Sequence, residues 1–250
     1  MGDERTAVVV GAGGDIGGAC ARELALSHDI VVCVDRNQER AKAIARAIPG
    51  RAKVVVADAT DIGFAGSVTA AVENVRSVVH AIAYEEQSPA ETITRDSIER
   101  SLAVGPVAAL LTFRELLVKE RLTAGASLVA IGSLHASMPF AGCVGYNAAH
   151  GALAQVVRSL AHEWADRRIR VNAVVPGWIR TQGETDLYGD EFLDSVASAL
   201  PFGRFGTPAD VASTVGFLCS DKAAYVSGSF FTVDGGLGAS LARLPQGPPT

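Results

Sequence analysis

The stretch Val8–Leu24, VVVGAGGDIGGACAREL, joins an apolar run to an amphipathic helical pattern through a turn rich in glycine. The residues at this turn that matter most are Gly11, Gly14, Asp15, Ile16 and Gly17. Because glycines have no side chain, they let the backbone approach a pyrophosphate at the N-terminus of the following helix. The stretch therefore predicts a dinucleotide-binding βαβ unit, although tight packing of helix on strand without a ligand would also use these glycines.

Outward from this turn, short β-branched runs alternate with longer helical patterns along the whole chain. The runs that predict strands are residues 6–10, 30–34, 52–57, 77–83, 127–132, 169–175 and 229–233. The helical patterns cover residues 16–27, 38–47, 66–75, 96–121, 144–166 and 208–220. The strands are almost continuously apolar, which indicates burial on both faces. We predict an α/β fold, a single Rossmann-type doubly wound parallel sheet with helices on both faces.

The domain organisation is predicted to be simple. We expect one nucleotide-binding domain over residues 1–236 and a C-terminal extension over 237–250, whose ending RLPQGPPT has the composition of a flexible tail. The irregular segment of about 181–205 follows a strand end, where ligands bind in such sheets. We therefore expect this segment to be a mobile substrate loop.

The composition of the chain limits the classes of binding partner that we expect. The net charge of -5 comes from mixed charges without basic runs, which argues against nucleic acid or an anionic membrane and favours a small-molecule partner. The four widely spaced cysteines show neither a disulfide framework nor metal-ligand spacing, so we expect reduced thiols and no metal. The first apolar run is too short for a signal peptide, and we expect a cytoplasmic protein.

Acidic residues follow the second and third strands. Asp35 in VVCVDRN can accept hydrogen bonds from the adenosine ribose hydroxyls and repel a 2'-phosphate, which favours NAD over NADP. Its neighbour Arg36 could instead contact a 2'-phosphate or stack on adenine. Asp58 could meet the adenine edge, but a turn or cap residue explains it equally well. Ala59 and Ala81, at strand ends, complete the candidate adenosine-side contacts.

Two hydroxyl groups mark a candidate catalytic end. Ser133 closes the strand SLVAIGS, and Tyr146 opens a long helical pattern in GYNAAHGAL. His150 follows Tyr146 by four residues, so the two share one helix face. We expect Ser133 and Tyr146 to bracket a substrate oxygen, with His150 beside the tyrosine.

These features together resemble the short-chain dehydrogenase/reductase family, in its compact one-domain branch, over nearly the whole chain. The resemblance also rests on IRVNAVVPGWIRT and on the closing RFGTPADVASTVGFLCSDKAAYVSGSFFTVDGG. It implies hydride transfer between a nicotinamide cofactor and a hydroxyl or ketone substrate. By position, Tyr146 would be the acid/base and Ser133 would hold the substrate oxygen. The residues that would border the nicotinamide are Pro176, Gly177, Ile179 and Thr181.

One departure from the family is central. His150 stands where the family carries a lysine, whose charge lowers the pKa of the tyrosine. At about 4 Å and an effective dielectric near 20, a unit charge contributes on the order of 4 kcal/mol, or roughly three pKa units. A mostly neutral imidazole loses most of this effect, so we expect His150 to be a weaker helper. The alternative is a histidine that only packs on the helix face.

Other departures concern the relay around the tyrosine. The sequence HAIA at 80–83 replaces the family's NNAG, and Gly105 stands near the place of the expected asparagine. Similarity to enoyl-thioester reductases is rejected, because their more distant lysine corresponds to Leu153 here. His135, Trp178 and Tyr188 are candidate pocket residues, although surface placement or simple packing would also explain them.

A rival hypothesis follows from the missing lysine and asparagine. The chain could be a catalytically degenerate dinucleotide-binding sensor or scaffold with the same fold. In either case the resemblance implies a homodimer or homotetramer, paired through the long helices that start near Asp96 and Val144. The alanine-rich segments AAHGALAQVV and AVGPVAALL suit close helix packing.

Overall fold

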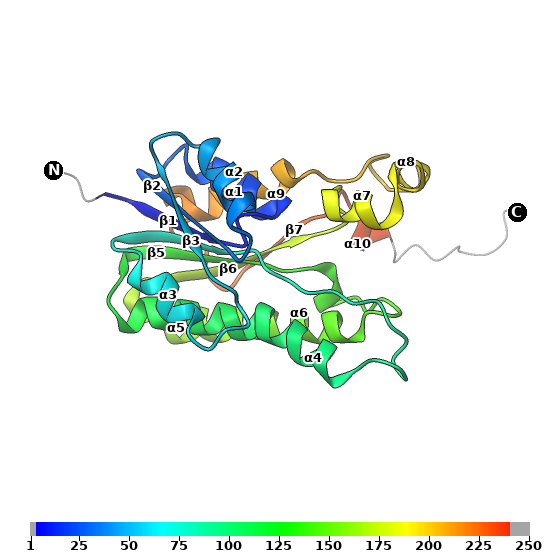
Figure 1. The fold of residues 1–250 in the computed structure, drawn as a ribbon, viewed down its shortest axis with the longest axis horizontal. Coiled ribbons are helices and arrows are strands. Elements are labelled where there is room, and N and C mark those ends of the chain that lie inside the picture. Colours follow the sequence, from blue (N-terminus) through cyan, green and yellow to red (C-terminus); the bar gives the residue numbers. More distant parts are fainter. Residues whose placement is uncertain (1–3, 241–250) are drawn as a thin grey trace, which may run out of the picture.

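The computed structural model describes residues 4–240 and has at its centre a seven-stranded parallel sheet (Figure 1). The strands are β1 Thr6–Val10, β2 Ile30–Asp35, β3 Ala52–Val56, β4 Val75–His80, β5 Leu122–Ile131, β6 Arg170–Pro176 and β7 Phe230–Val233. Their order is β3-β2-β1-β4-β5-β6-β7, and every pair is parallel. The order reverses beside β1, which is the position where dinucleotides bind in such sheets. The predicted Rossmann-type doubly wound fold is confirmed.

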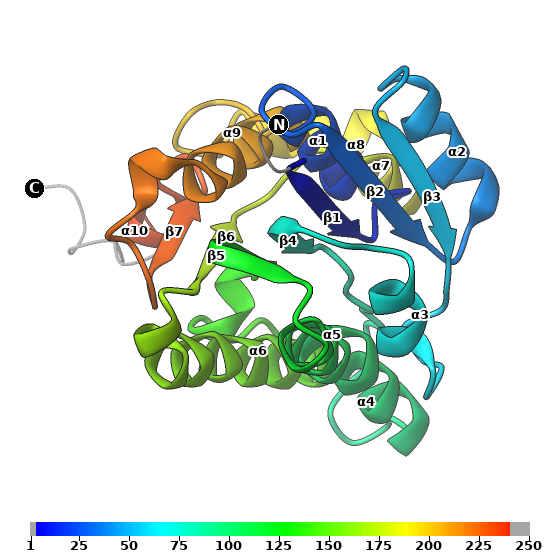
Figure 2. The same cartoon turned by 90° about the vertical axis from the view of Figure 1, so that its left-hand side faces the viewer.

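Helices cover both faces of the sheet (Figure 2). One face carries α1 Asp15–Leu24, α2 Gln38–Arg46 and α9 Pro208–Cys219. The other carries α3 Phe64–Ala70, α4 Arg95–Leu102, α5 Ala108–Val118 and α6 Val144–Glu163. Each face has its own core, with Leu218 buried on the first and Phe113 on the second. Burial of each layer against the sheet holds the strand ends, and hence the site, in place.

Burial differs between central and edge strands. Every residue of β1 and β6 is buried, as the apolar runs predict. The expectation of burial on both faces is wrong for β3 and β7, where most residues are only half-buried. These two strands lie at the edges of the sheet, where each has only one neighbouring strand.

Some element boundaries differ from the prediction. Strand β4 begins at Val75, which was expected to end a helix, and it stops at His80, before the predicted end of the run. The single helix expected over 96–121 is interrupted by a π-helix, Ala103–Val107, which contains Pro106. Proline has no N–H, so it cannot donate an α-helical hydrogen bond. A helical pattern continues on both sides, through the polar α4 and the more apolar α5, and conceals this change of geometry in the sequence.

The segment expected to be irregular instead folds into two short helices, α7 Gln182–Tyr188 and α8 Asp190–Ala197. The Thr181 side chain accepts a hydrogen bond from the Glu184 N–H and so caps α7. Gly189, with φ of 77°, separates the two helices. We call residues 181–197 the lid, which lies at one end of the molecule in Figure 1.

Two hydrogen bonds connect the lid to the rest of the fold. The backbone N–H of Gln182 donates to Asp15 Oδ2 at 2.6 Å, next to the glycine turn. On the opposite side, Gln87 Nε2 donates to the Tyr188 hydroxyl at 2.7 Å. The lid therefore bridges the N-terminal turn and the loop after β4, two segments that are distant in sequence.

The chain end and one apolar helix complete the description. Helix α10, Leu237–Ser240, falls in the predicted extension, and residues 241–250 lie outside the described residues, so the domain limits stay a prediction. The stretch Arg95–Val118 is long and apolar enough to cross a membrane. Half of its most apolar window is buried in the fold, as in the core helix of a soluble protein.

Candidate active site

The glycine turn after β1 forms one wall of a cavity. Gly11 has a positive φ of 84°, a conformation that favours glycine. The Gly13 N–H donates to Asp35 Oδ2 at 2.8 Å, and a Cβ on Gly13 would lie 2.8 Å from the same oxygen. A Cβ on Gly17 would lie 2.1 Å from the carbonyl oxygen of Gly11, so Gly17 serves close packing. Gly13 was not among the predicted contacts, although the doubled glycine was its signal.

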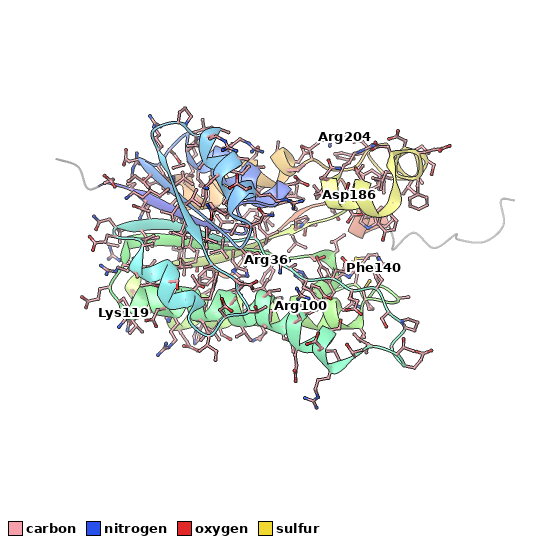
Figure 3. All side chains as sticks on the ribbon, in the orientation of Figure 1. Arg36, Arg100, Lys119, Phe140, Asp186 and Arg204 are labelled. Carbon is pink, nitrogen blue, oxygen red and sulfur yellow. The ribbon has the colours of Figure 1, made fainter. Side chains whose placement is uncertain are left out.

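The cavity beside the glycine turn, which we call the adenosine-side cavity, has a volume of about 320 Å³. Its lining includes the predicted Gly11, Gly14, Asp35, Arg36, Asp58, Ala59 and Ala81, together with Gly13, Asn37, Arg40 and Arg100. Arg36 and Arg100 are labelled in Figure 3 near the middle of the molecule. Asp35 Oδ1 accepts the Asn37 N–H at 2.8 Å, so both of its oxygens are engaged by backbone groups.

The charge of Arg36 is directed at Asp58. Its Nη1 lies 3.8 Å from Asp58 Oδ2. The pKa of Asp58 is lowered, first by the Thr60 backbone N–H and further by the Thr60 hydroxyl and Arg36. Asp58 is therefore a turn residue that also lines the cavity, and its contact with an adenine stays a prediction.

A second cavity, of about 220 Å³, lies at the carboxyl ends of the central strands. The predicted residues that line it are Ile16, Ala81, Ser133, Tyr146, His150, Pro176, Gly177, Ile179 and Thr181, and the lid adds Glu184. Two predicted cofactor residues, Asp15 and Gly17, do not line any of the cavities described here. Asp15 instead accepts the hydrogen bond from the lid, and Gly17 packs under the turn.

Ser133 and Tyr146 meet at this cavity from β5's end and from the start of α6. Burial raises the pKa of the Tyr146 phenol well above its ordinary value of 10, and the Glu85 carboxylate raises it further. Hydrogen bonding by Ser133 acts in the opposite direction. The His150 ring lies 4.3 Å from the Tyr146 ring, and the His135 ring lies 4.9 Å away, edge-on. Tyr146 is thus held protonated between two imidazoles at neutral pH.

His150 is buried and neutral. Its side chain is 5% exposed, and its Nδ1 has no hydrogen-bond partner among residues 4–240. Burial lowers the pKa of His150 to about 4, with smaller contributions from His135 and His80. Gly105, near the place of the family's asparagine, lies in the π-helix and offers no side chain to fill the orphaned bond. His150 therefore cannot supply the positive charge that a lysine would.

A third cavity, of about 330 Å³, opens on the other side of the Ser133–Tyr146 pair. It is lined by the anticipated His135, Trp178 and Tyr188, and by Glu85, Gln87, Phe140, Cys143, Glu184, Phe192 and Phe205. Phe140 and the lid residue Asp186 are labelled toward the same end of the molecule in Figure 3. Sequence reasoning missed Glu85 and Glu184, because a loop and a lid separated by 99 positions carry no shared motif.

A parallel sheet with a glycine turn at its switch point and a serine–tyrosine pair beside it defines a dinucleotide-dependent oxidoreductase. The family model described as enoyl-(acyl carrier protein) reductase matches residues 11–238. The chain belongs to the short-chain dehydrogenase/reductase family of nicotinamide-dependent oxidoreductases. The description of the family model names one activity, and the names of the relatives give other activities.

Two curated relatives cover nearly the whole chain. A 3-oxoacyl-(acyl-carrier-protein) reductase of Rickettsia bellii is 28% identical over 93% of this chain and 96% of its own. A 2,5-dichloro-2,5-cyclohexadiene-1,4-diol dehydrogenase of Sphingobium indicum is 30% identical over 93% and 95%. A solved structure from Beutenbergia cavernae, described as an NAD(P)-dependent gluconate 5-dehydrogenase with bound NADP, has a TM-score of 0.86 at 33% identity. That match covers 94% of this chain and 97% of the other.

Proposed function

We propose that the protein transfers a hydride between NAD and a small hydroxyl or ketone substrate, with Tyr146 exchanging the proton and Ser133 holding the substrate oxygen. The observation that carries this proposal is that both side chains line the second and the third cavity at once. A substrate oxygen at this junction is within reach of a proton donor and a hydroxyl, next to the space predicted for the nicotinamide. Such positioning of a proton donor typically contributes about 10²- to 10⁴-fold to the rate.

The residues present fit a dinucleotide. A Cβ on Gly13 would collide with Asp35 Oδ2, so glycine lets the turn pack against this carboxylate, and Gly11, Gly13 and Gly14 line the cavity without side chains. Gly11, Gly14 and Asp35 would hold the adenosine and pyrophosphate, and Pro176 and Thr181 would border the nicotinamide. When bound, the cofactor supplies the carbon that gives or takes the hydride.

A preference for NAD is supported by the carboxylate of Asp35. It lies on the cavity wall where a 2'-phosphate would be repelled, and the Arg36 guanidinium is directed at Asp58. The solved structure from Beutenbergia cavernae holds NADP, so the preference for NAD rests on Asp35 alone. We expect NADH to bind more tightly than NADPH in a titration followed by nicotinamide fluorescence, and an Asp35→Asn variant to reduce the difference. Tighter binding of NADPH by the unmodified protein would overturn this preference.

His150 is proposed as a hydrogen-bonding helper without charge. It lines the cofactor-side cavity one helical turn from Tyr146, and burial keeps its imidazole neutral. A neutral imidazole can still donate or accept one hydrogen bond there. Tyr146 is then held in its protonated form, which is the form that protonates a carbonyl oxygen during ketone reduction.

A Tyr146→Phe variant tests the catalytic assignment. We expect it to lose turnover of a panel of ketones and alcohols by at least about 10²-fold, which is the typical contribution of a positioned proton donor. Binding of NADH should be kept, since the glycine turn is unaffected. Turnover retained by this variant would reject Tyr146 as the acid/base. The rival sensor or scaffold hypothesis is not favoured, because the relatives that cover the chain are reductases and dehydrogenases by name.

Assembly and location are also proposals. Val107 at the end of the π-helix, Leu111 and Val118 on α5 and Val144 on α6 are large apolar side chains with exposed surface, which supports pairing of these helices in a homodimer or homotetramer. Light scattering of the purified protein gives the oligomeric state directly. Four free cysteines buried in the fold support a reducing, cytoplasmic location.

A further inference from the structure

The third cavity, of about 330 Å³, is lined by acidic side chains. Glu85, on the loop after β4, and Glu184, on α7, both line it. The two carboxylates share this cavity wall, and the pKa of Glu184 is raised, first by burial and then by the Glu85 carboxylate. Among residues 4–240, no lysine, arginine or histidine forms an ion pair with either carboxylate.

Among residues 4–240, the basic side chain on the same wall is His135. Within the described part of the chain, no lysine or arginine lines this cavity. Arg180, which follows the lining residue Ile179, is occupied elsewhere: its guanidinium donates to Asp190 at 2.6 Å and to Asp194 at 2.5 Å. The protein therefore provides two carboxylates in this cavity without providing their counter-charge.

Aromatic rings form much of the remaining wall. Trp178 and Phe205 stack with their centroids 6.1 Å apart, and Tyr188 and Phe192 pack at 5.7 Å. The electron-rich faces of such rings attract cations, and carboxylates at the rim add to that attraction. Aromatic rings and carboxylates that line the same cavity can together bind an ammonium group.

We propose that the substrate carries an ammonium group, so that the reaction interconverts a cationic amino alcohol and the corresponding amino ketone. This inference rests on the proposed function and identifies its substrate class. In the oxidative direction the alcohol carbon gives a hydride to the oxidised cofactor and the hydroxyl proton leaves through Tyr146. The carbon–oxygen double bond forms, and the ammonium group keeps its charge beside Glu85 and Glu184. A volume of about 330 Å³ suits a molecule of modest size.

The same wall disfavours anions. A carboxylate or phosphate on the substrate would add a third negative charge to a half-buried space that already holds two. The family relationship to enzymes of acyl-carrier or sugar-acid metabolism therefore does not extend to the charge of the substrate.

Three ketones of matched shape test the inference. The first is a methyl ketone with a dimethylamino group three methylenes from the carbonyl, the second replaces the protonated nitrogen by CH, and the third ends in a carboxylate. We expect kcat/KM at pH 7 with reduced cofactor to favour the cationic ketone over its neutral isostere by about tenfold, roughly 1.4 kcal/mol. The anionic ketone should be the poorest of the three.

Variants assign the preference to the carboxylates. Glu184→Gln and Glu85→Gln should each reduce the ratio of cationic to neutral kcat/KM, and the double variant should bring it near one. Glu191→Gln, which removes the same charge from an exposed position of α8 outside the cavity, is the matched control and should keep the ratio. Calorimetry with the cationic ketone and its neutral isostere, in the presence of oxidised NAD, which cannot give a hydride to a ketone, gives the same comparison for binding alone.

The outcomes separate the two proposals. Turnover of all three ketones without charge preference, or a ratio unchanged in the glutamine variants, would overturn the substrate class and leave the hydride-transfer function standing. Preferential binding of the cation that depends on Glu85 and Glu184, without turnover of any ketone, would support the ligand class and reject the catalytic proposal. Binding with no charge preference in calorimetry would overturn the ligand class whatever the activity.

Discussion

Replacing His150 with lysine would place a positive charge beside Tyr146, and the distance between the two rings sets the scale of the expected effect. The rings of Tyr146 and His150 are 4.3 Å apart, and the imidazole is neutral because burial lowers its pKa to about 4. A unit positive charge at about 4 Å, with an effective dielectric near 20, stabilises the phenolate by on the order of 4 kcal/mol. That corresponds to a fall of roughly three units in the pKa of Tyr146.

Alcohol oxidation reports this fall, because the phenolate is the form that accepts the substrate proton. At a pH below both pKa values the phenolate fraction rises about tenfold for each unit by which the pKa falls. We therefore expect His150→Lys to move the rising limb of the kcat/KM profile toward acid by up to about three pH units. Ketone reduction should change less, since Tyr146 is protonated in both proteins at neutral pH.

Two controls separate charge from hydrogen bonding and from misfolding. His150→Gln keeps a polar side chain without charge and should leave the profile near its original position. Thermal unfolding and NADH titration establish that the lysine variant is folded and binds cofactor. A folded, cofactor-binding His150→Lys variant with an unshifted profile would refute the claim that the missing charge controls Tyr146.

Two further predictions concern stability. Gly17→Ala should lower the free energy of unfolding by about 1–3 kcal/mol, because its Cβ would meet the Gly11 carbonyl. Gly66→Ala, at an exposed position of α3, should raise the free energy of unfolding by about 0.5–1 kcal/mol. A denaturant titration that ranks the two variants otherwise would contradict this packing. His80, with a pKa lowered by burial from 6.5 to about 4, takes up its proton on unfolding between these values. His80 should therefore contribute about 3 kcal/mol to the fall in stability between pH 6.5 and 4, and His150, whose pKa burial also lowers to about 4, should add a similar amount. His80→Asn should remove its own share of this pH dependence, and an unchanged slope would count against a buried neutral imidazole.

The fold could be predicted because each central strand contains a short, almost continuously apolar run. Gly11 and Gly14 lie where the strand-to-helix signal placed them, on the wall of the adenosine-side cavity. Ser133 and Tyr146 meet as expected, since a strand end and a helix start converge at one edge of a parallel sheet. Local sequence signals were sufficient for this part of the site.

Features that depend on distant contacts could not be predicted. Glu85 and Glu184 reach one cavity from a loop and from the lid, and neither lies in a recognisable motif. Asp15 reads as a cofactor residue in the sequence, but its partner is the backbone of the lid, 167 positions away. Burial lowers the pKa of His150 to about 4, and this burial comes from residues that are distant in sequence, so no local pattern predicts it.

The π-helix Ala103–Val107 has a consequence for the angular relation between two helices. A π-turn holds one residue more than an α-turn, and each residue advances a helix by about 100°. The extra residue therefore sets the rotational phase between α4, which packs on α6, and α5, which packs on α3. Deleting one residue there would turn α5 by about 100° and carry the fully buried Phe113 out of its core. The extra residue of the π-helix therefore allows α4 and α5 to turn their apolar sides toward the core at the same time.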